Sequence, residues 1–129
     1  MRRILITVGT TAVPAELNQG LTATAIFEAL PIEATAHRWG QEIYFEIPVA
    51  AELEAGARAE VEVGELGYWP VGRAFCIFFG PTPASTDSRP RAYSPVTIVG
   101  RLLADPSPLR AVKEGSRIRL AAAGRESAL

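Results

Sequence analysis

One arginine and four aromatic residues are the side chains best suited to holding a ligand. They are Arg38, Trp39, Tyr68, Trp69 and Tyr93. An arginine beside aromatic rings can stack on them and still donate hydrogen bonds to a carbonyl or a carboxylate. Gly67 and Pro70 enclose the Tyr-Trp pair and indicate a sharp, rigid corner. We therefore predict that Arg38, Tyr68, Trp69 and Tyr93 converge on one groove, whose ligand has an apolar part and a hydrogen-bond acceptor.

The segment from Gly80 to Pro95 is the longest stretch without a regular pattern, and it includes Tyr93. A loop of this length in a compact domain is usually functional or mobile. Its four prolines reduce the entropy that it loses on becoming ordered. We expect this loop to form a wall of the groove, opposite the turn from Arg38 to Glu42 and the corner from Tyr68 to Pro70.

The carboxylates of Glu42 and Glu46 do not have the spacing of a glycosidase pair. On a strand, residues four apart lie roughly 13 Å apart, whereas that chemistry needs about 5–9.5 Å. Glu42, Tyr44 and Glu46 share one face of a predicted strand, and we expect that face to be solvated. Glu42 still belongs to the predicted groove, because it ends the turn that starts at Arg38.

Other catalytic and cofactor classes have little support in the sequence. His37 is the only histidine and Cys76 the only cysteine, which excludes a Cys/His zinc cluster and an intrachain disulfide. A hydrolase would need His37 with one of the serines, but no G-x-S-x-G motif is present. No phosphate-binding glycine loop is present either. We expect no metal and no cofactor, and we assign Cys76 to the core as a small apolar residue.

Length and charge bound the class of protein. The 129 residues have the composition of one globular domain. Residues 1–66 carry a charge of −6 and residues 67–129 a charge of +5. We expect the two halves to pair in one sheet, so that opposite charges meet across strands. No basic run is dense enough for nucleic acid, and no segment is apolar enough to cross a membrane. A cytoplasmic location is the expectation.

Strand patterns dominate the chain. Apolar and polar residues alternate in five segments, at residues 4–8, 32–37, 42–47, 58–63 and 117–120. This alternation is typical of half-buried antiparallel strands. The apolar run from Ala74 to Phe79 predicts a strand buried on both faces, and 96–103 predicts another. Many short strands in a chain of this size favour a sandwich or a closed barrel. In a barrel, Ile43, Phe45, Val61 and Ile77 would point inward.

Helix is expected in one or two short pieces. The spacing of Leu21, Ala25, Ile26 and Ala29 predicts a helix over about 22–30, with Asn18 or Gly20 at its start and Pro31 at its end. A short turn is expected over 107–112.

Four motifs together resemble those of a small prokaryotic protein family of unknown function with a cyclophilin-like barrel. They are HRWGQEIYFEI at 37–47, GELGYWPVG at 64–72, FCIFFGPTP at 75–83 and SPV at 94–96. The resemblance implies that residues 1–129 form one closed antiparallel β-barrel of about eight strands with one or two short helices. It implies no established activity.

True cyclophilins are prolyl isomerases, and the resemblance suggests which of their residues are retained. The pair His37-Arg38 is similar to their catalytic His-Arg pair, whereas Ala74 and Cys76 stand where they have glutamine and phenylalanine. An arginine that hydrogen-bonds the prolyl nitrogen would weaken the partial double bond of the imide. The alternative for Arg38 is a surface ion pair with Glu42 or Glu46.

The sequence therefore favours a cyclophilin-like protein that binds a small molecule or a proline-containing peptide without established catalysis. The predicted ligand-binding residues are Arg38, Trp39, Glu42, Tyr68, Trp69 and Tyr93. The alternative is a divergent peptidyl-prolyl cis-trans isomerase that uses Arg38 as its catalytic residue. A third interpretation is a homo-oligomer that buries the aromatic corner between subunits.

Overall fold

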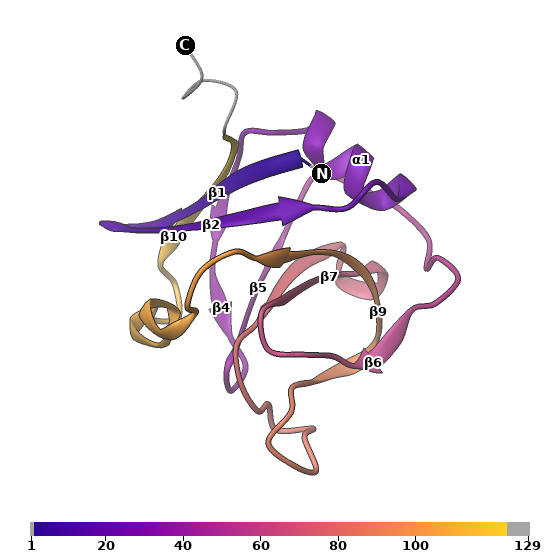
Figure 1. The fold of residues 1–129 in the computed structure, drawn as a ribbon, viewed down its shortest axis with the longest axis vertical. Coiled ribbons are helices and arrows are strands. Elements are labelled where there is room, and N and C mark those ends of the chain that lie inside the picture. The colour runs from indigo at the N-terminus through magenta and orange to yellow at the C-terminus, as the bar shows by residue number, and fades with distance from the viewer. Residues whose placement is uncertain (1, 124–129) are drawn as a thin grey trace.

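The computed structural model describes residues 2–123, which form a predominantly β protein (Figure 1). Ten strands are found in these residues. They are β1 (Arg2–Val8), β2 (Thr11–Leu17), β3 (Ile32–Thr35), β4 (His37–Arg38), β5 (Glu42–Glu46), β6 (Arg58–Glu60), β7 (Glu65–Trp69), β8 (Ala74–Phe78), β9 (Arg91–Leu102) and β10 (Arg117–Ala122). No helix among residues 2–123 is long and apolar enough to cross a membrane.

The strands pair in the order β3-β10-β1-β2-β9-β7-β8-β5-β4, always antiparallel, and β6 pairs separately with β9. The prediction of an antiparallel β fold is confirmed, but those of a closed barrel and of about eight strands are wrong. Within the described residues, no hydrogen-bonded ladder joins β3 to β4 at the two ends of the sheet. Strands β3 and β4 do not pair with each other because only Ala36 separates them, so they form one continuous segment. The first part of this segment, β3, pairs with β10, and the second part, β4, pairs with β5.

The sheet carries two apolar clusters on its opposite faces. The larger one is the main core, which includes Ile43, Phe45 and Ile77 as predicted. The smaller one, here called the outer cluster, contains Val61, Ala74, Cys76, Phe78, Ala92 and Val96. Successive side chains of β8 alternate between the two clusters, which explains its unbroken apolar sequence. Val61 was predicted to point into the barrel, but it packs in the outer cluster.

The predicted helical pieces are present with small shifts. Helix α1 spans Leu21–Glu28, and Gly20 is its N-cap residue. Leu21 was expected on the apolar stripe, yet its side chain is exposed, and the buried face of α1 starts at Thr22. Two short 3₁₀ helices follow, η1 (Pro70–Gly72) and η2 (Ser107–Ala111), the second at the predicted turn.

Opposite charges of the two halves of the chain meet across strands, as expected. Three acidic residues of the first half lie directly opposite an arginine of the second half and pair with it. These pairs are Glu16–Arg101 at 3.1 Å, Glu33–Arg119 at 3.5 Å and Glu60–Arg91 at 3.3 Å. The charge asymmetry of the sequence therefore reflects strand pairing rather than a basic binding face.

The segment expected to be irregular from Gly80 to Pro95 becomes a strand at Arg91. Strand β9 continues from there to Leu102, with a marked irregularity near its start. Glu60 of β6 pairs with Arg91 and Arg58 pairs with Val96, so residues 92–95 lie opposite Ala59 alone. Such a bulge re-aims the side chains of the longer strand.

Candidate functional site

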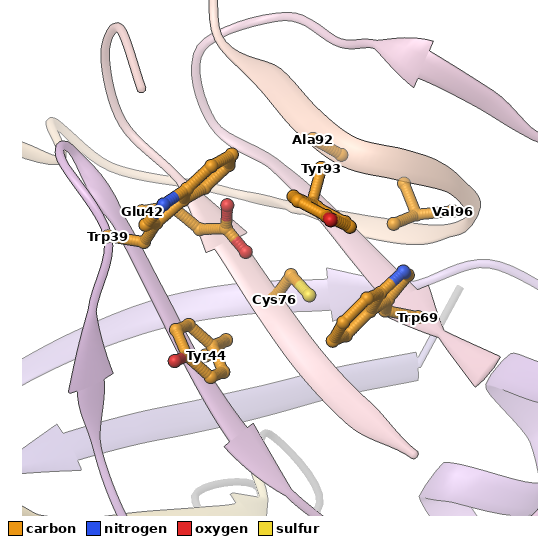
Figure 2. Close-up of a pocket in the computed structure, with 8 residues that line it drawn as sticks. All are labelled: Trp39, Glu42, Tyr44, Trp69, Cys76, Ala92, Tyr93 and Val96. Carbon is orange, nitrogen blue, oxygen red and sulfur yellow. The ribbon is translucent and has the colours of Figure 1, made fainter. Parts of the chain in front are cut away.

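A pocket of about 130 Å³ lies against the outer cluster (Figure 2). Eight residues from β5, β7, β8, β9 and the turn after β4 line it. They are Trp39, Glu42, Tyr44, Trp69, Cys76, Ala92, Tyr93 and Val96. Four of these eight residues were predicted for the groove, namely Trp39, Glu42, Trp69 and Tyr93. The lining carries no basic side chain.

Strands β5 and β8 supply the base of the pocket. Tyr44 lies directly opposite Cys76 in their antiparallel ladder, and Glu42 lies opposite Phe78. On the far side of Cys76 the cross-strand neighbour is Gly67. A Cβ atom at Gly67 would lie 2.9 Å from Cγ2 of Val96, closer than side chains normally approach. The missing side chain therefore lets Val96 pack close to the sheet and form part of the wall.

The bulge in β9 places Tyr93 between the two tryptophans. Its ring centroid lies 6.1 Å from that of Trp39 and 6.0 Å from that of Trp69. The ring planes are inclined by 68° and 74°, in the edge-to-face arrangement that aromatic pairs favour. Tyr93 is 76% exposed, so it forms the rim of the pocket rather than its base.

Trp69 is fixed by two contacts. Its indole Nε1–H donates a hydrogen bond of 2.7 Å to Oγ of Ser94, a residue of the same bulge. Its ring packs against Gly72, where a Cβ atom would lie 2.9 Å from Cε3 of the indole. Trp69 is half-buried, which agrees with a place in a pocket wall. Contacts within the protein therefore fix this wall of the site.

Glu42 is the chemically distinctive residue of the pocket. Only 5% of it is exposed, and its Oε1 atom has no hydrogen-bond partner within residues 2–123. Burial raises the pKa of its carboxyl group from the ordinary 4.5 to about 7, and the neighbouring Cys76 thiol partly offsets that increase. The prediction of a solvated face is therefore wrong for Glu42. The outer cluster covers this end of β5, whereas Glu46 at the other end is exposed.

Cys76 is buried, as expected for a small core residue, but it lies in the outer cluster beside Glu42. Burial, and then the charge and hydrogen-bonding capacity of Glu42, raise the pKa of its thiol well above the ordinary value. A thiol in this state is a poor nucleophile, because the thiolate is the reactive form. Cys76 contributes shape to the pocket.

Arg38 does not line the pocket. It lies opposite Ile43, a main-core residue, so its side chain leaves the sheet on the face opposite to Glu42. Its guanidinium donates hydrogen bonds to the carbonyl oxygens of Gly40, Arg110 and Val112, at 3.0, 3.2 and 2.7 Å. It also lies 5.1 Å from the ring centroid of Phe79. Arg38 therefore attaches the end of η2 to the sheet, and it pairs with neither Glu42 nor Glu46.

Tyr68 is also absent from the pocket. It is fully buried in the main core, where its hydroxyl donates a 2.6 Å hydrogen bond to the carbonyl oxygen of Val49. Because neighbouring residues of a strand point to opposite faces, Tyr68 and Trp69 cannot share a groove. The single groove predicted for Arg38, Tyr68, Trp69 and Tyr93 is therefore wrong, and only the last two of these lie together.

Four pocket residues were not predicted, namely Tyr44, Cys76, Ala92 and Val96. The alternation of β5 placed Tyr44 on the face of Glu42, and that signal would have found it. Nδ1 of His37, next to Arg38, lies within hydrogen-bonding distance of Oε2 of Glu114, at 2.6 Å, and His37 takes no part in the pocket. Among residues 2–123, no group of three acidic, histidine or cysteine side chains has the arrangement of a metal site.

Comparison with known proteins defines the class to which this fold belongs. The family model described as Cyclophilin-like matches residues 2–121, and the chain belongs to that family. Its fold is similar to the solution structure of the hypothetical protein AF2241 from Archaeoglobus fulgidus, at 38% sequence identity and a TM-score of 0.81. The alignment covers 95% of each chain. Among curated proteins, no relative was found.

Proposed function

We propose that this protein binds a small ligand, with a compact apolar group of the size of one ring, in the pocket between Trp39 and Trp69. The observation that carries the proposal is an apolar pocket that holds one buried carboxyl group, whose Oε1 atom has no hydrogen-bond partner within residues 2–123. Apolar walls with a few convergent polar groups are typical of small-molecule sites. A buried polar atom without a partner in the protein is a natural contact for a ligand.

The volume limits the ligand to one small group. An apolar cavity of about 150 Å³ in another protein holds one benzene molecule, and this pocket measures about 130 Å³. A proline ring or a phenol ring matches this size, whereas a larger ligand must extend past Tyr93 at the exposed rim. The polar preference differs from the one predicted from the sequence. Since the pocket offers Glu42 and no arginine, a ligand with a hydrogen-bond donor or a positive charge is favoured over a carboxylate.

Prolyl isomerisation by Arg38 has no support in the geometry of the site. The guanidinium already donates to three backbone carbonyl groups, and it lies on the other face of the sheet from the aromatic pocket. A proline ring held between the tryptophans would therefore not meet Arg38. Binding without catalysis is the function that we propose.

The test is a titration of isotope-labelled protein with single-ring probes, monitored by amide and indole NMR signals. The probes are phenol and the amide of acetylated proline. We expect the indole signals of Trp39 and Trp69 to shift most. The variant Ala92→Leu fills the pocket and should abolish the shifts, whereas Ala104→Leu, at an exposed alanine outside it, should preserve them.

If Ala92→Leu perturbs the fold, Tyr93→Ala provides a second test. Tyr93 is mostly exposed, so its removal opens the pocket with little effect on stability, and the shifts should weaken. The proposal fails if these neutral probes, choline and the amide of acetylated trimethyllysine all leave the spectrum unchanged. It also fails if their shifts are the same in the filled variant.

A further inference from the structure

We infer that the ligand of this pocket is an organic cation with a methylated ammonium head, held between the aromatic rings and the carboxylate of Glu42. The inference rests on the proposed function and names the chemical class of its ligand. Two independent observations carry it. One is the arrangement of the rings around the pocket. The other is that Glu42, its single acidic residue, has no basic residue beside it in the lining.

The rings form an enclosure rather than a stack. Four of the eight lining side chains are aromatic, and they come from separate elements of the fold. They are Trp39, Tyr44, Trp69 and Tyr93. Because the planes of both tryptophans are steeply inclined to that of Tyr93, the rings surround the space from different directions (Figure 2). The faces of aromatic rings attract cations within about 6 Å, and enclosures of this kind bind methylated ammonium groups.

The charge of the pocket has one sign. Glu42 is its only acidic residue, and the other titratable side chains of the lining are Tyr44, Cys76 and Tyr93. Burial raises the pKa of the Cys76 thiol well above its ordinary value, so the thiol adds no charge near pH 7. The carboxyl group of Glu42 extends toward the space between Trp39, Tyr93 and Cys76 (Figure 2). An ionised carboxylate is unfavourable in an apolar environment unless a cation pairs with it. A cationic ligand would supply that partner, whereas an anion would be repelled.

The apolar lining selects a methylated ammonium over a primary one. A primary ammonium carries three N–H donors and is costly to bury unless each finds an acceptor. The lining provides one carboxyl group and two phenol hydroxyls at most. A trimethylammonium head has no N–H donor and presents methyl groups to the rings. It is also of about the size of the single ring that the volume allows. A free quaternary amine and a trimethyllysine side chain share this head.

The experiment compares choline with 3,3-dimethylbutan-1-ol, which has the same shape but no charge, by titration calorimetry and NMR. We expect choline to bind at least about tenfold more tightly, which corresponds to about 1.4 kcal/mol. Choline should also bind about tenfold more tightly at pH 8 than at pH 6, because the ionised fraction of Glu42 increases about tenfold between these values. The amide of acetylated trimethyllysine tests whether the same trimethylammonium head is bound when it belongs to a modified lysine side chain.

Two variants separate the contributions of charge and ring. Glu42→Gln keeps the shape of the side chain and should remove both the preference for choline and its pH dependence. Tyr93→Leu keeps an apolar rim and should weaken choline several-fold more than it weakens the neutral alcohol. Equal binding of the two probes, with no effect of Glu42→Gln, would overturn the cation inference and leave the proposed function intact. Failure of charged and neutral probes alike would reject both.

Discussion

Replacement of Glu42 by glutamine should change how the stability of this protein depends on pH. The carboxyl group is 5% exposed in an apolar environment, and burial raises its pKa to about 7. In the unfolded chain the same group ionises near its ordinary value of 4.5. The folded state therefore holds a proton that the unfolded state releases between these two values. Glutamine has nearly the same shape and cannot ionise.

The sign and the size of the effect follow from proton binding. Stability decreases with rising pH wherever the folded state binds more protons than the unfolded state. The loss from Glu42 therefore begins near pH 4.5 and is complete slightly above pH 7. Each pKa unit corresponds to about 1.36 kcal/mol, so the full loss is about 3 kcal/mol. Below pH 4.5 the group is protonated in both states, and wild type and variant should differ least.

The assay is urea unfolding at half-unit steps from pH 4 to pH 8, monitored by tryptophan fluorescence and far-UV circular dichroism. The informative quantity is the difference in unfolding free energy between Glu42→Gln and wild type at each pH. This difference should grow in favour of the variant by about 3 kcal/mol between pH 4.5 and pH 8. Glu46→Gln is the matched control, because Glu46 is an exposed carboxylate on the same face of β5.

A difference that stays constant across this range would refute the reasoning. It would mean that Glu42 ionises in the folded protein as easily as in the unfolded one. Water or another group in the site would then offset the cost of burying the ionised carboxylate. The same slope in Glu46→Gln would point instead to general charge repulsion. In either case Glu42 would have no energetic need of a cationic partner.

Three further predictions concern the neighbouring structure. Arg38→Ala should lower the unfolding free energy by about 2 kcal/mol, since three hydrogen bonds to backbone carbonyls are lost, while calorimetry shows unchanged binding in the pocket; a selective loss of binding would contradict this placement. Gly67→Ala should cost about 1–3 kcal/mol in urea unfolding and weaken ligand binding, because its Cβ displaces Val96; wild-type stability would show that the wall yields freely. Cys76 should react with iodoacetamide only after unfolding, given its burial and raised thiol pKa; rapid labelling of the native protein, followed by mass spectrometry, would count against it.

Much of the fold follows from alternation in the sequence. The pattern of β5 placed Ile43 and Phe45 on one face and Glu42 and Tyr44 on the other, and the structure confirms that division. The β character, helix α1 and the pairing of opposite charges across strands follow from similar local signals. The predicted closure of the sheet was wrong, because alternation determines which face a residue occupies but not which strands lie next to each other.

The site was predicted only in part because alternation does not show which faces are covered. Glu42 looked like a solvated residue, since nothing local indicates that the start of β9 folds over it. That cover depends on the bulge at residues 92–95. Between the two paired positions, β9 advances by five residues while β6 advances by two. Tyr68 and Trp69 looked equivalent as exposed aromatic residues at a corner, although adjacent positions of a strand necessarily diverge.

The division of β5 and β8 between two faces separates the main core from the pocket. Ile43, Phe45 and Ile77 pack the main core, whereas Glu42 and Cys76, on the same strands, face the pocket. A substitution at Glu42 or Cys76 would therefore change the lining of the pocket without leaving a hole in the main core. The walls behave differently, because Trp39, Trp69 and Tyr93 depend on the bulge in β9 for their mutual contacts. We therefore expect substitutions at Glu42 and Cys76, at the base of the pocket, to change its ligand preference. Substitutions at Trp39, Trp69 or Tyr93 should instead disrupt the pocket itself.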